Sequence, residues 1–258
     1  MQIVISALHF PWTDMAECLH RAKDELGLDG VELSLHTSFA RPHCTREDLD
    51  VLASLRQRHE LALSAHIWND LPRSDSAAEE LLGWLPVCAK TGVGHLILHG
   101  GSHSDQREGI ARVRRVLETV LPAFERAGVV LHLENHYAYD YHGCQELFSE
   151  PWEFFEVFSL DSPSLRCCFD TGHAHMTRNV DELLHALRPW LDYVHLADNR
   201  GIDDDHLMYR QGTVNWDGIL AQLRDANFDG VFCVEYPVRE NREPFNRCKE
   251  DIRRLWTA

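Results

Sequence analysis

The chain lacks long hydrophobic runs. No stretch approaches 18 consecutive apolar residues, and the first residues, MQIVISALHF, have neither a basic start nor a long apolar segment. A membrane-spanning helix needs about 20 apolar residues, and a secretory signal needs both of the missing features. We therefore expect a cytoplasmic protein that makes no contact with a membrane.

The cysteines lack the pattern of a disulfide framework. Eight of them are scattered along 258 residues without a CxxC pair, and Cys167, Cys168 and Cys233 lie inside expected strands. Disulfide frameworks occur mainly in small secreted domains. We interpret these cysteines as reduced and mostly buried thiols.

Positive charge is scarce as well. The 25 Lys and Arg residues face 41 Asp and Glu residues, which gives a formal net charge of −16 at pH 7. Proteins that hold a nucleic-acid backbone normally present a basic face. Nucleic acid is therefore an unfavourable partner.

No Pro/Gly/Ser linker, low-complexity tract or heptad repeat divides the chain, so we expect one domain over residues 1–258. The length suits a single (β/α)8 TIM barrel, an α/β fold. Helical patterns, including one over 76–92, separate short apolar runs. These runs predict eight strands, at about 3–7, 30–35, 61–67, 95–99, 129–135, 165–170, 191–197 and 230–236.

Four of these runs end in an acid or an imidazole. VVLHLENH contains Glu134, LRCCFDTGHAH contains Asp170, LDYVHLADN contains His195, and GVFCVEYP contains Glu235. The carboxyl ends of parallel barrel strands are where barrel enzymes place their chemistry. Three carboxylates and one imidazole suit Mn²⁺, Mg²⁺, Co²⁺ or Zn²⁺. Any one of the carboxylates could equally cap a helix or pair with an arginine, but the four together predict a metal site.

The segments LENH, FDTGHAH, VHLADN and VEYP are similar to the strand-end motifs of the xylose-isomerase-like TIM-barrel superfamily. This superfamily contains sugar isomerases, ketose 3-epimerases, inosose dehydratases and barrel-type apurinic/apyrimidinic (AP) endonucleases. The resemblance extends over essentially the whole chain, because all eight units fit. The motifs identify the superfamily more strongly than any one member.

Resemblance to the epimerase branch implies that Glu134, Asp170, His195 and Glu235 bind one divalent ion, with Mn²⁺ as the first expectation. Glu134 and Glu235 would also exchange protons with the substrate through an enediolate. Two carboxylates can act as the general base and the general acid of such a reaction. The same branch implies substrate contacts for two further residues, His173 and Arg200. Arg200 could equally be a solvated surface residue.

Resemblance to the endonuclease branch implies three ions. His66, His99 and Glu134 would hold one, the four residues above the second, and a third set would be His173, Asp204 and His206. The segments around these ligands differ from that branch, and the acidic mouth suits DNA poorly. His66 and His99 could equally be pocket residues that contact substrate hydroxyl groups.

Aromatic residues near the expected mouth could form a wall over a sugar ring. Trp68 follows His66 closely, and Tyr137, Tyr139 and Tyr141 lie in the long segment after Glu134. Ordinary loop packing is the alternative for each of them.

The sequence thus favours a divalent-metal-dependent isomerase or epimerase of a small sugar or sugar-like keto-polyol. A multinuclear phosphoester hydrolase and a keto-cyclitol dehydratase remain as alternatives. A small-molecule sugar or polyol is the expected partner, and assembly into a homo-oligomer stays open.

Overall fold

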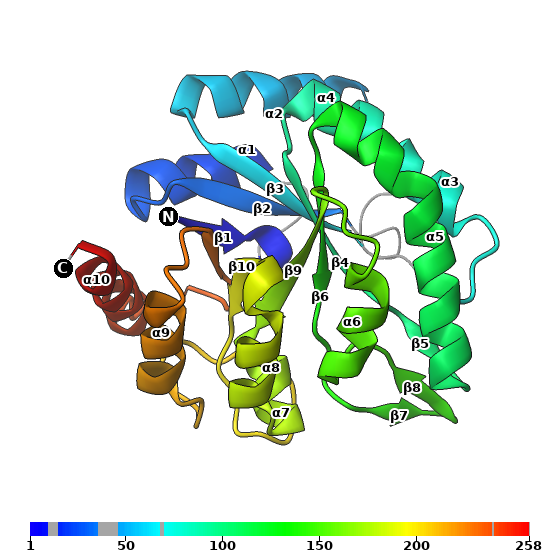
Figure 1. Ribbon diagram of the computed structural model, residues 1–258. Helices are drawn as coiled ribbons and strands as arrows, with labels where there is room; N and C mark the ends of the chain where they lie inside the picture. The colour runs from blue at the N-terminus through cyan, green and yellow to red at the C-terminus, as the bar shows by residue number, and fades with distance from the viewer. Residues whose placement is uncertain (10–14, 36–45, 68–69, 239, 258) are drawn as a thin grey trace.

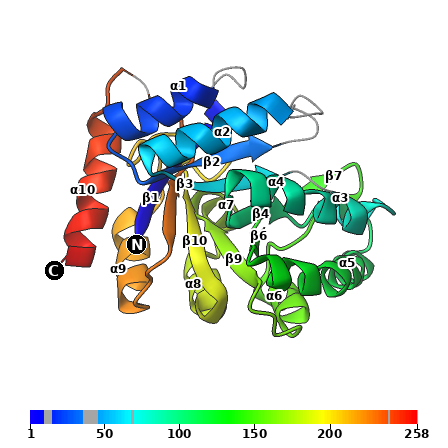
Figure 2. The same cartoon turned by 90° about the horizontal axis from the view of Figure 1, so that it is seen from above.

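The computed structural model describes residues 1–9, 15–35, 46–67, 70–238 and 240–257. Eight parallel strands close into a barrel in the order β1-β11-β10-β9-β6-β4-β3-β2, with helices around it (Figures 1 and 2). The barrel strands are β1 (Gln2–Ser6), β2 (Gly30–Leu35), β3 (Ala62–Ile67), β4 (His95–His99), β6 (Val130–Glu134), β9 (Leu165–Asp170), β10 (Leu191–Leu196) and β11 (Val231–Val234). The predicted TIM barrel is confirmed, and each predicted strand is found within two residues of its expected ends.

The α-helices follow the predicted alternation with strands, with two differences. They are α1 (Met15–His20), α2 (Arg46–His59), α3 (Ala77–Gly83), α4 (Leu85–Thr91), α5 (Gln106–Ala127), α6 (Pro151–Phe158), α7 (Thr171–Thr177), α8 (Val180–Leu187), α9 (Trp216–Asp225) and α10 (Glu243–Thr257). The expected helix over 76–92 is divided at Trp84, because Pro86 lacks an amide hydrogen and instead occupies the first turn of α4. The short helix α7 was not expected. Irregular helical turns are η1 (Ala7–His9), η2 (Arg21–Glu25) and η3 (Arg188–Trp190).

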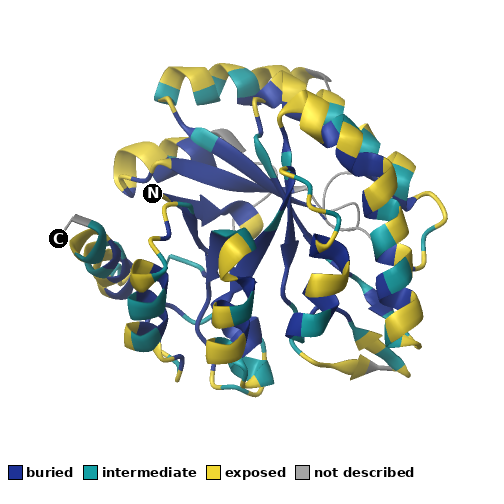
Figure 3. Cartoon of the chain, viewed as in Figure 1, coloured by how far each residue is buried: buried dark blue, intermediate teal, exposed yellow. Residues whose placement is uncertain are grey.

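The barrel strands have two buried faces, as the dark strands of Figure 3 show. Outward residues such as Val31 and Leu33 belong to the large apolar cluster beneath the helices. The alternate residues face the barrel interior, where a separate apolar cluster is formed by Val4, Ile97, Cys168, Tyr193, Val231 and Cys233. Because successive side chains of a strand point to opposite faces, the interior also receives buried polar residues such as Glu32 and His132. The alternation of side chains along each strand therefore places these polar residues inside the barrel.

A small antiparallel sheet lies outside the barrel. Its strands are β5 (Ser102–His103), β7 (Asp140–Tyr141) and β8 (Cys144–Glu146), in the order β5-β8-β7. It joins the segment after β4 to the segment after β6, near one end of α5 (Figure 1). The backbone of Gly100 passes so close to the ring of Phe148 that a Cβ atom would collide with it. The long segment after Glu134 is thus held by strand pairing and packing.

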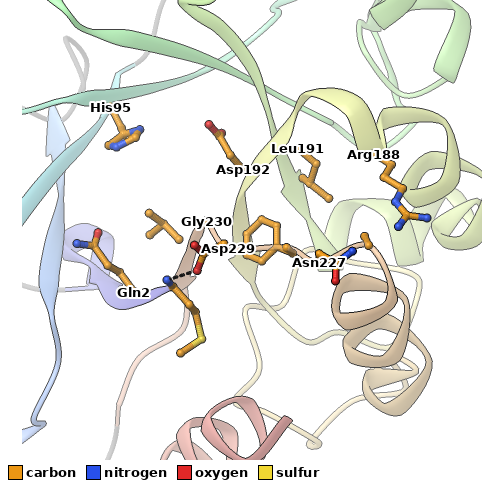
Figure 4. Close-up of a pocket in the computed structure, with 12 residues that line it drawn as sticks. Gln2, His95, Arg188, Leu191, Asp192, Asn227, Asp229 and Gly230 are labelled. Atoms are coloured by element: carbon orange, nitrogen blue, oxygen red, sulfur yellow. Dashed lines mark hydrogen bonds and ion pairs between the residues drawn. The ribbon is translucent and has the colours of Figure 1, made fainter. Parts of the chain in front are cut away.

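At the amino ends of the strands lies a cavity of about 550 Å³, lined by residues that include Gln2, His95, Asp192 and Asp229 (Figure 4). It is on the opposite side of the barrel from the strand-end acids.

Within the described part of the chain, no helix has both the length and the apolar composition of a membrane span. The seven described cysteines are free thiols, and all except Cys144 are buried.

Candidate metal centre

The four strand-end residues meet at the carboxyl end of the barrel. Glu134 ends β6, Asp170 ends β9, His195 lies in β10, and Glu235 directly follows β11. One ligand atom from each lies within 4.8 Å of the others, and all four side chains are buried. Neighbouring strands deliver them, since Asp170 and His195 are register partners in the β9–β10 pair. The structure therefore brings together the four residues that the sequence predicted as a set.

His195 lies at the middle of this cluster. Its Nδ1 atom is 3.1 Å from Glu134 Oε1 and 3.0 Å from Glu235 Oε2. Burial disfavours the charged forms of both glutamates, but His195 outweighs it, lowering the pKa of Glu235 to about 2 and that of Glu134 well below its usual range. His195 therefore favours the ionised form of both glutamates.

Asp170 holds α7 with one oxygen and leaves the other without a partner. Its Oδ1 accepts a hydrogen bond of 2.6 Å from the backbone amide of His173, which caps the helix. Its Oδ2 is buried and has no hydrogen-bond partner. Burial raises the pKa of Asp170 to about 7. A buried carboxylate oxygen with no donor, beside two ionised glutamates, fits a site for a divalent cation.

Asn135 fixes the position of Asp170. Its Oδ1 accepts from the Asp170 amide at 2.7 Å, and its Nδ2 donates to the Asp170 carbonyl at 3.1 Å. The side chain of Asn135 thus continues the pairing of β6 with β9 beyond the last residue of β6.

Two more histidines reach Glu134 from the other side. The Nε2 atoms of His66 and His99 lie 3.0 Å and 3.2 Å from Glu134 Oε2. Ligand atoms of these three residues also lie within 4.8 Å of one another. Burial opposes a charge on both rings. Glu134 outweighs burial at His66, where the pKa is raised, but not at His99, where the pKa is lowered.

Asp204 joins His173 and His206. Its Oδ2 is 3.5 Å from His173 Nε2 and 3.1 Å from His206 Nε2. Each ring directs its Nδ1 to a backbone carbonyl, of Asn135 at 2.8 Å and of Glu235 at 2.7 Å. Burial opposes ionisation of Asp204, but the two histidines hold its pKa below the ordinary range. The third predicted set is therefore assembled around one carboxylate.

A cavity of about 240 Å³ opens onto these clusters. Its lining is formed by Ser6, Leu8, Ser34, His66, His99, Glu134, His136, Tyr137, His173, Asp204, His206 and Glu235. None of these residues is a lysine or an arginine. Within the described residues, the cavity thus presents hydroxyl, imidazole and carboxylate groups to a ligand.

One predicted substrate contact, Arg200, is not found at this cavity. The side chain of Arg200 is 60% exposed, and its Nη1 lies 3.5 Å from Asp205 Oδ2. It borders a different surface pocket, beside α8, because the segment after β10 carries it outward. Trp68 lies outside the described residues. Of the three tyrosines, Tyr137 lines the cavity, Tyr139 is half exposed, and the side chain of Tyr141 lies outside the description.

Glu32, which lies on β2 and contacts His195, is not among the site residues predicted from the sequence. Its Oε2 is 2.8 Å from His195 Nε2 and accepts a hydrogen bond of 2.9 Å from the Tyr193 hydroxyl. The available signal was the alternation in GVELSL, which turns Glu32 inward between Val31 and Leu33. A carboxylate in the middle of a strand with two buried faces needs a partner.

Comparison with known proteins gives the family and the fold. A family model described as Xylose isomerase-like TIM barrel matches residues 20–257. A D-tagatose 3-epimerase-like protein superposes with a TM-score of 0.81 at 22% identity, over 100% of this chain and 97% of that one. For a D-psicose 3-epimerase solved in the presence of D-fructose, the TM-score is 0.77 at 15% identity, with the same coverage. The 3-keto-D-glucoside 4-epimerase of E. coli gives 0.72 at 17% identity, over 100% of both chains.

Two uncharacterized proteins of Methanocaldococcus jannaschii are similar in sequence. One is 35% identical over 82 residues, which are 31% of this chain and 28% of that protein. The other is 24% identical over 146 residues, or 55% of each protein. The chain thus matches less than two thirds of either relative. At identities below 25% the solved structures show a shared fold. Together with the closed eight-stranded barrel, the match over residues 20–257 shows that the chain belongs to the xylose isomerase-like TIM-barrel family.

Proposed function

We propose that this protein is a divalent-metal-dependent epimerase or isomerase of a small sugar or sugar-like keto-polyol. One observation carries the proposal: Glu134, Asp170, His195 and Glu235 converge in one buried cluster, and Glu134 and Glu235 also line the cavity. The structural likeness to sugar epimerases supports the same choice. The expected ion is Mn²⁺, with Zn²⁺, Co²⁺ and Mg²⁺ as the alternatives that this donor set also suits.

The four clustered residues would hold the ion. Bound there, a divalent ion supplies Lewis-acid polarisation of a substrate carbonyl. The remaining work belongs to Glu134 and Glu235. One glutamate, in its ionised form, can remove a proton from the carbon beside the carbonyl, and the other, carrying a proton taken up from solvent, can return that proton to the carbon. Exchange of protons with solvent then restores both glutamates. Proton return to the opposite face gives epimerisation.

The lining of the cavity supports an uncharged, polyhydroxylated substrate. The imidazoles of His66, His99 and His136 can exchange hydrogen bonds with hydroxyl groups. The absence of lysine and arginine from the described lining is unfavourable for a phosphorylated sugar, since phosphate is usually held by arginine, lysine or a cradle of amides.

Solvent exchange tests this function. The protein is loaded with Mn²⁺ and incubated in D₂O with a panel of free ketoses, and the products are followed by NMR. The proposal expects one ketose to acquire deuterium at the carbon beside its carbonyl while a 3-epimer or an aldose forms. Loss of water from a keto-cyclitol would support the dehydratase instead. Absence of exchange with every ketose would contradict the proposal.

A multinuclear phosphoester hydrolase is the second candidate, favoured by the group formed by His66, His99 and Glu134. Two or three clustered ions are suited to hydrolysis because they activate water and stabilise the leaving oxygen. Cleavage of a duplex that contains an abasic site would favour this function over the first.

A further inference from the structure

A second buried polar layer lies beneath the ligand cluster, further from the mouth of the barrel. It consists of Glu32 on β2, Ser64 on β3 and Tyr193 on β10. The Ser64 and Tyr193 hydroxyl oxygens are 2.8 Å apart, and the Tyr193 hydroxyl donates to Glu32 Oε2. Glu32 has no exposed surface, and the other two residues are also buried.

Glu32 meets His195 on the opposite side of the ring from the ligand cluster. Its Oε2 is 2.8 Å from His195 Nε2, whereas His195 Nδ1 faces Glu134 and Glu235. The same Oε2 accepts the hydrogen bond from the Tyr193 hydroxyl, and as an acceptor toward the ring it places a hydrogen on Nε2. A neutral imidazole with its hydrogen on Nε2 has its free lone pair on Nδ1. In the metal-free protein Glu134 and Glu235 face Nδ1 in the same way, so a hydrogen on Nδ1 has to leave when a metal ion binds there. The contact with Glu32 keeps the hydrogen on Nε2, which leaves Nδ1 as the ligand atom.

We propose that Glu32 is a positioning residue of the metal centre, which holds the ring of His195 with Nε2 toward the barrel interior and Nδ1 toward the ion. The inference rests on the proposed function in one respect, because it takes the four-residue cluster to be the metal site. Carboxylates that orient ligating histidines typically change metal affinity by about 10–100-fold when they are replaced. The Tyr193 hydroxyl is hydrogen-bonded to Ser64 and donates to the Glu32 carboxylate, which restricts the movement of that carboxylate.

A different role for Glu32 is also conceivable from the geometry. Ligand atoms of Glu32, His195 and Cys233 lie within 4.8 Å of one another, so the three could hold an ion of their own in the barrel interior. Such an ion would need Nε2 of His195 without its hydrogen. It would therefore exclude the hydrogen bond from Nε2 to Glu32, and the number of bound ions separates the two roles.

The test is a titration of the metal-free protein with Co²⁺, followed by visible absorption and by calorimetry. The variant Glu32→Gln keeps the size of the side chain but removes the charged acceptor. A matched control is Glu153→Gln, which alters an equally buried glutamate at the first turn of α6, away from the cluster. Circular dichroism and melting temperature are measured for both variants, so that loss of folding is not mistaken for loss of binding.

We expect the wild type and Glu153→Gln to bind one Co²⁺ with the same spectrum. For Glu32→Gln we expect binding weaker by about 10-fold or more and a changed absorption band, because His195 is no longer fixed in one orientation. Unchanged affinity and spectrum in the folded Glu32→Gln protein would overturn the inference. So would a fall from two bound ions to one, since Glu32 would then be a ligand.

This outcome is separable from the fate of the proposed function. If the wild type binds one Co²⁺ and Glu32→Gln weakens it while no ketose is turned over, the positioning role stands and the sugar chemistry fails. If the wild type binds no divalent ion, both proposals fail.

Discussion

At the scale of single residues, the site combines atoms with different tasks. Asp170 uses one oxygen to cap α7 and leaves the other for a cation, and His195 presents one nitrogen to each of two layers. Glu134 receives His66 and His99 on Oε2 and His195 on Oε1. Single substitutions of these groups should therefore have separate effects on turnover and on the number of bound metal ions.

Glu235→Gln should lower turnover of the ketose substrate by about 10²–10⁴-fold, because an amide cannot act as a general base. The fold should persist, since the side chain keeps its size. Steady-state kinetics and deuterium incorporation measure the effect, and the melting temperature controls for folding. Full activity in this variant would remove Glu235 from proton transfer.

His66→Ala and His99→Ala should each leave one metal ion per chain. The reason is that neither residue belongs to the four-residue cluster, although both contact Glu134. Metal analysis of each purified variant is the measurement, with Asp170→Ala as the matched variant that should lose the ion. A lower metal content in either histidine variant would favour the multinuclear site.

At the scale of elements, the strands were predictable and the connections were not. Runs such as VFCVEY specify a strand with two buried faces, and the four ligands follow from the ends of such runs. The division between α3 and α4 follows from Pro86, which the helical pattern concealed. The small sheet and the outward position of Arg200 depend on tertiary packing of long segments. The contact of Glu32 with His195 joins β2 to β10, and attention to strand ends alone could not find it.

The amino end of the barrel carries a pair of histidines. His95 Nδ1 is 2.9 Å from His132 Nε2, and His132 Nδ1 is 3.0 Å from Asp192 Oδ1. These groups belong to β4, β6 and β10, and His95 and Asp192 line the cavity of Figure 4. Burial, together with His132, lowers the pKa of His95 to about 4, although Asp192 acts in the opposite direction.

The folded protein should therefore become less stable in acid through His95. The unfolded chain binds a proton at this residue near pH 6.5, whereas the folded chain binds it only near pH 4. The contribution of His95 to the free energy of unfolding is complete above about pH 6.5. It is lost as the pH falls toward 4, by as much as about 3 kcal/mol.

Urea unfolding of the wild type and of His95→Gln at pH 7, 6 and 5 measures this effect. The advantage of the wild type over the variant should shrink as the pH falls. His185→Gln, on the exposed face of α8, is measured beside it as the control for replacing a histidine away from this pocket. A difference that does not change with pH for His95→Gln would contradict the expectation.

At the scale of the whole molecule, closure of the eight-stranded barrel brings Glu134 and Glu235, which are 101 positions apart, into one cluster. An ion bound to Glu134, Asp170, His195 and Glu235 would link four strands of the folded state. An unfolded chain offers no such preformed site, so binding should add to the stability of the whole barrel.

Mn²⁺ should therefore raise the melting temperature of the metal-free protein. At a free concentration 100-fold above the dissociation constant, binding stabilises the folded state by about 2.7 kcal/mol. For a chain of this size, we expect a rise of roughly 5–10 °C. Differential scanning calorimetry measures the shift, which a chelator should reverse and Asp170→Ala should abolish. An unchanged melting temperature in the wild type would be evidence against a metal site.

The most direct test of the central claim is the metal content per chain, measured by inductively coupled plasma mass spectrometry on protein purified without an affinity tag or added metal. The account predicts one divalent ion per chain, with manganese as the first expectation. Protein with no bound ion that also fails to take one up on dialysis, or two or three ions per chain, would contradict it.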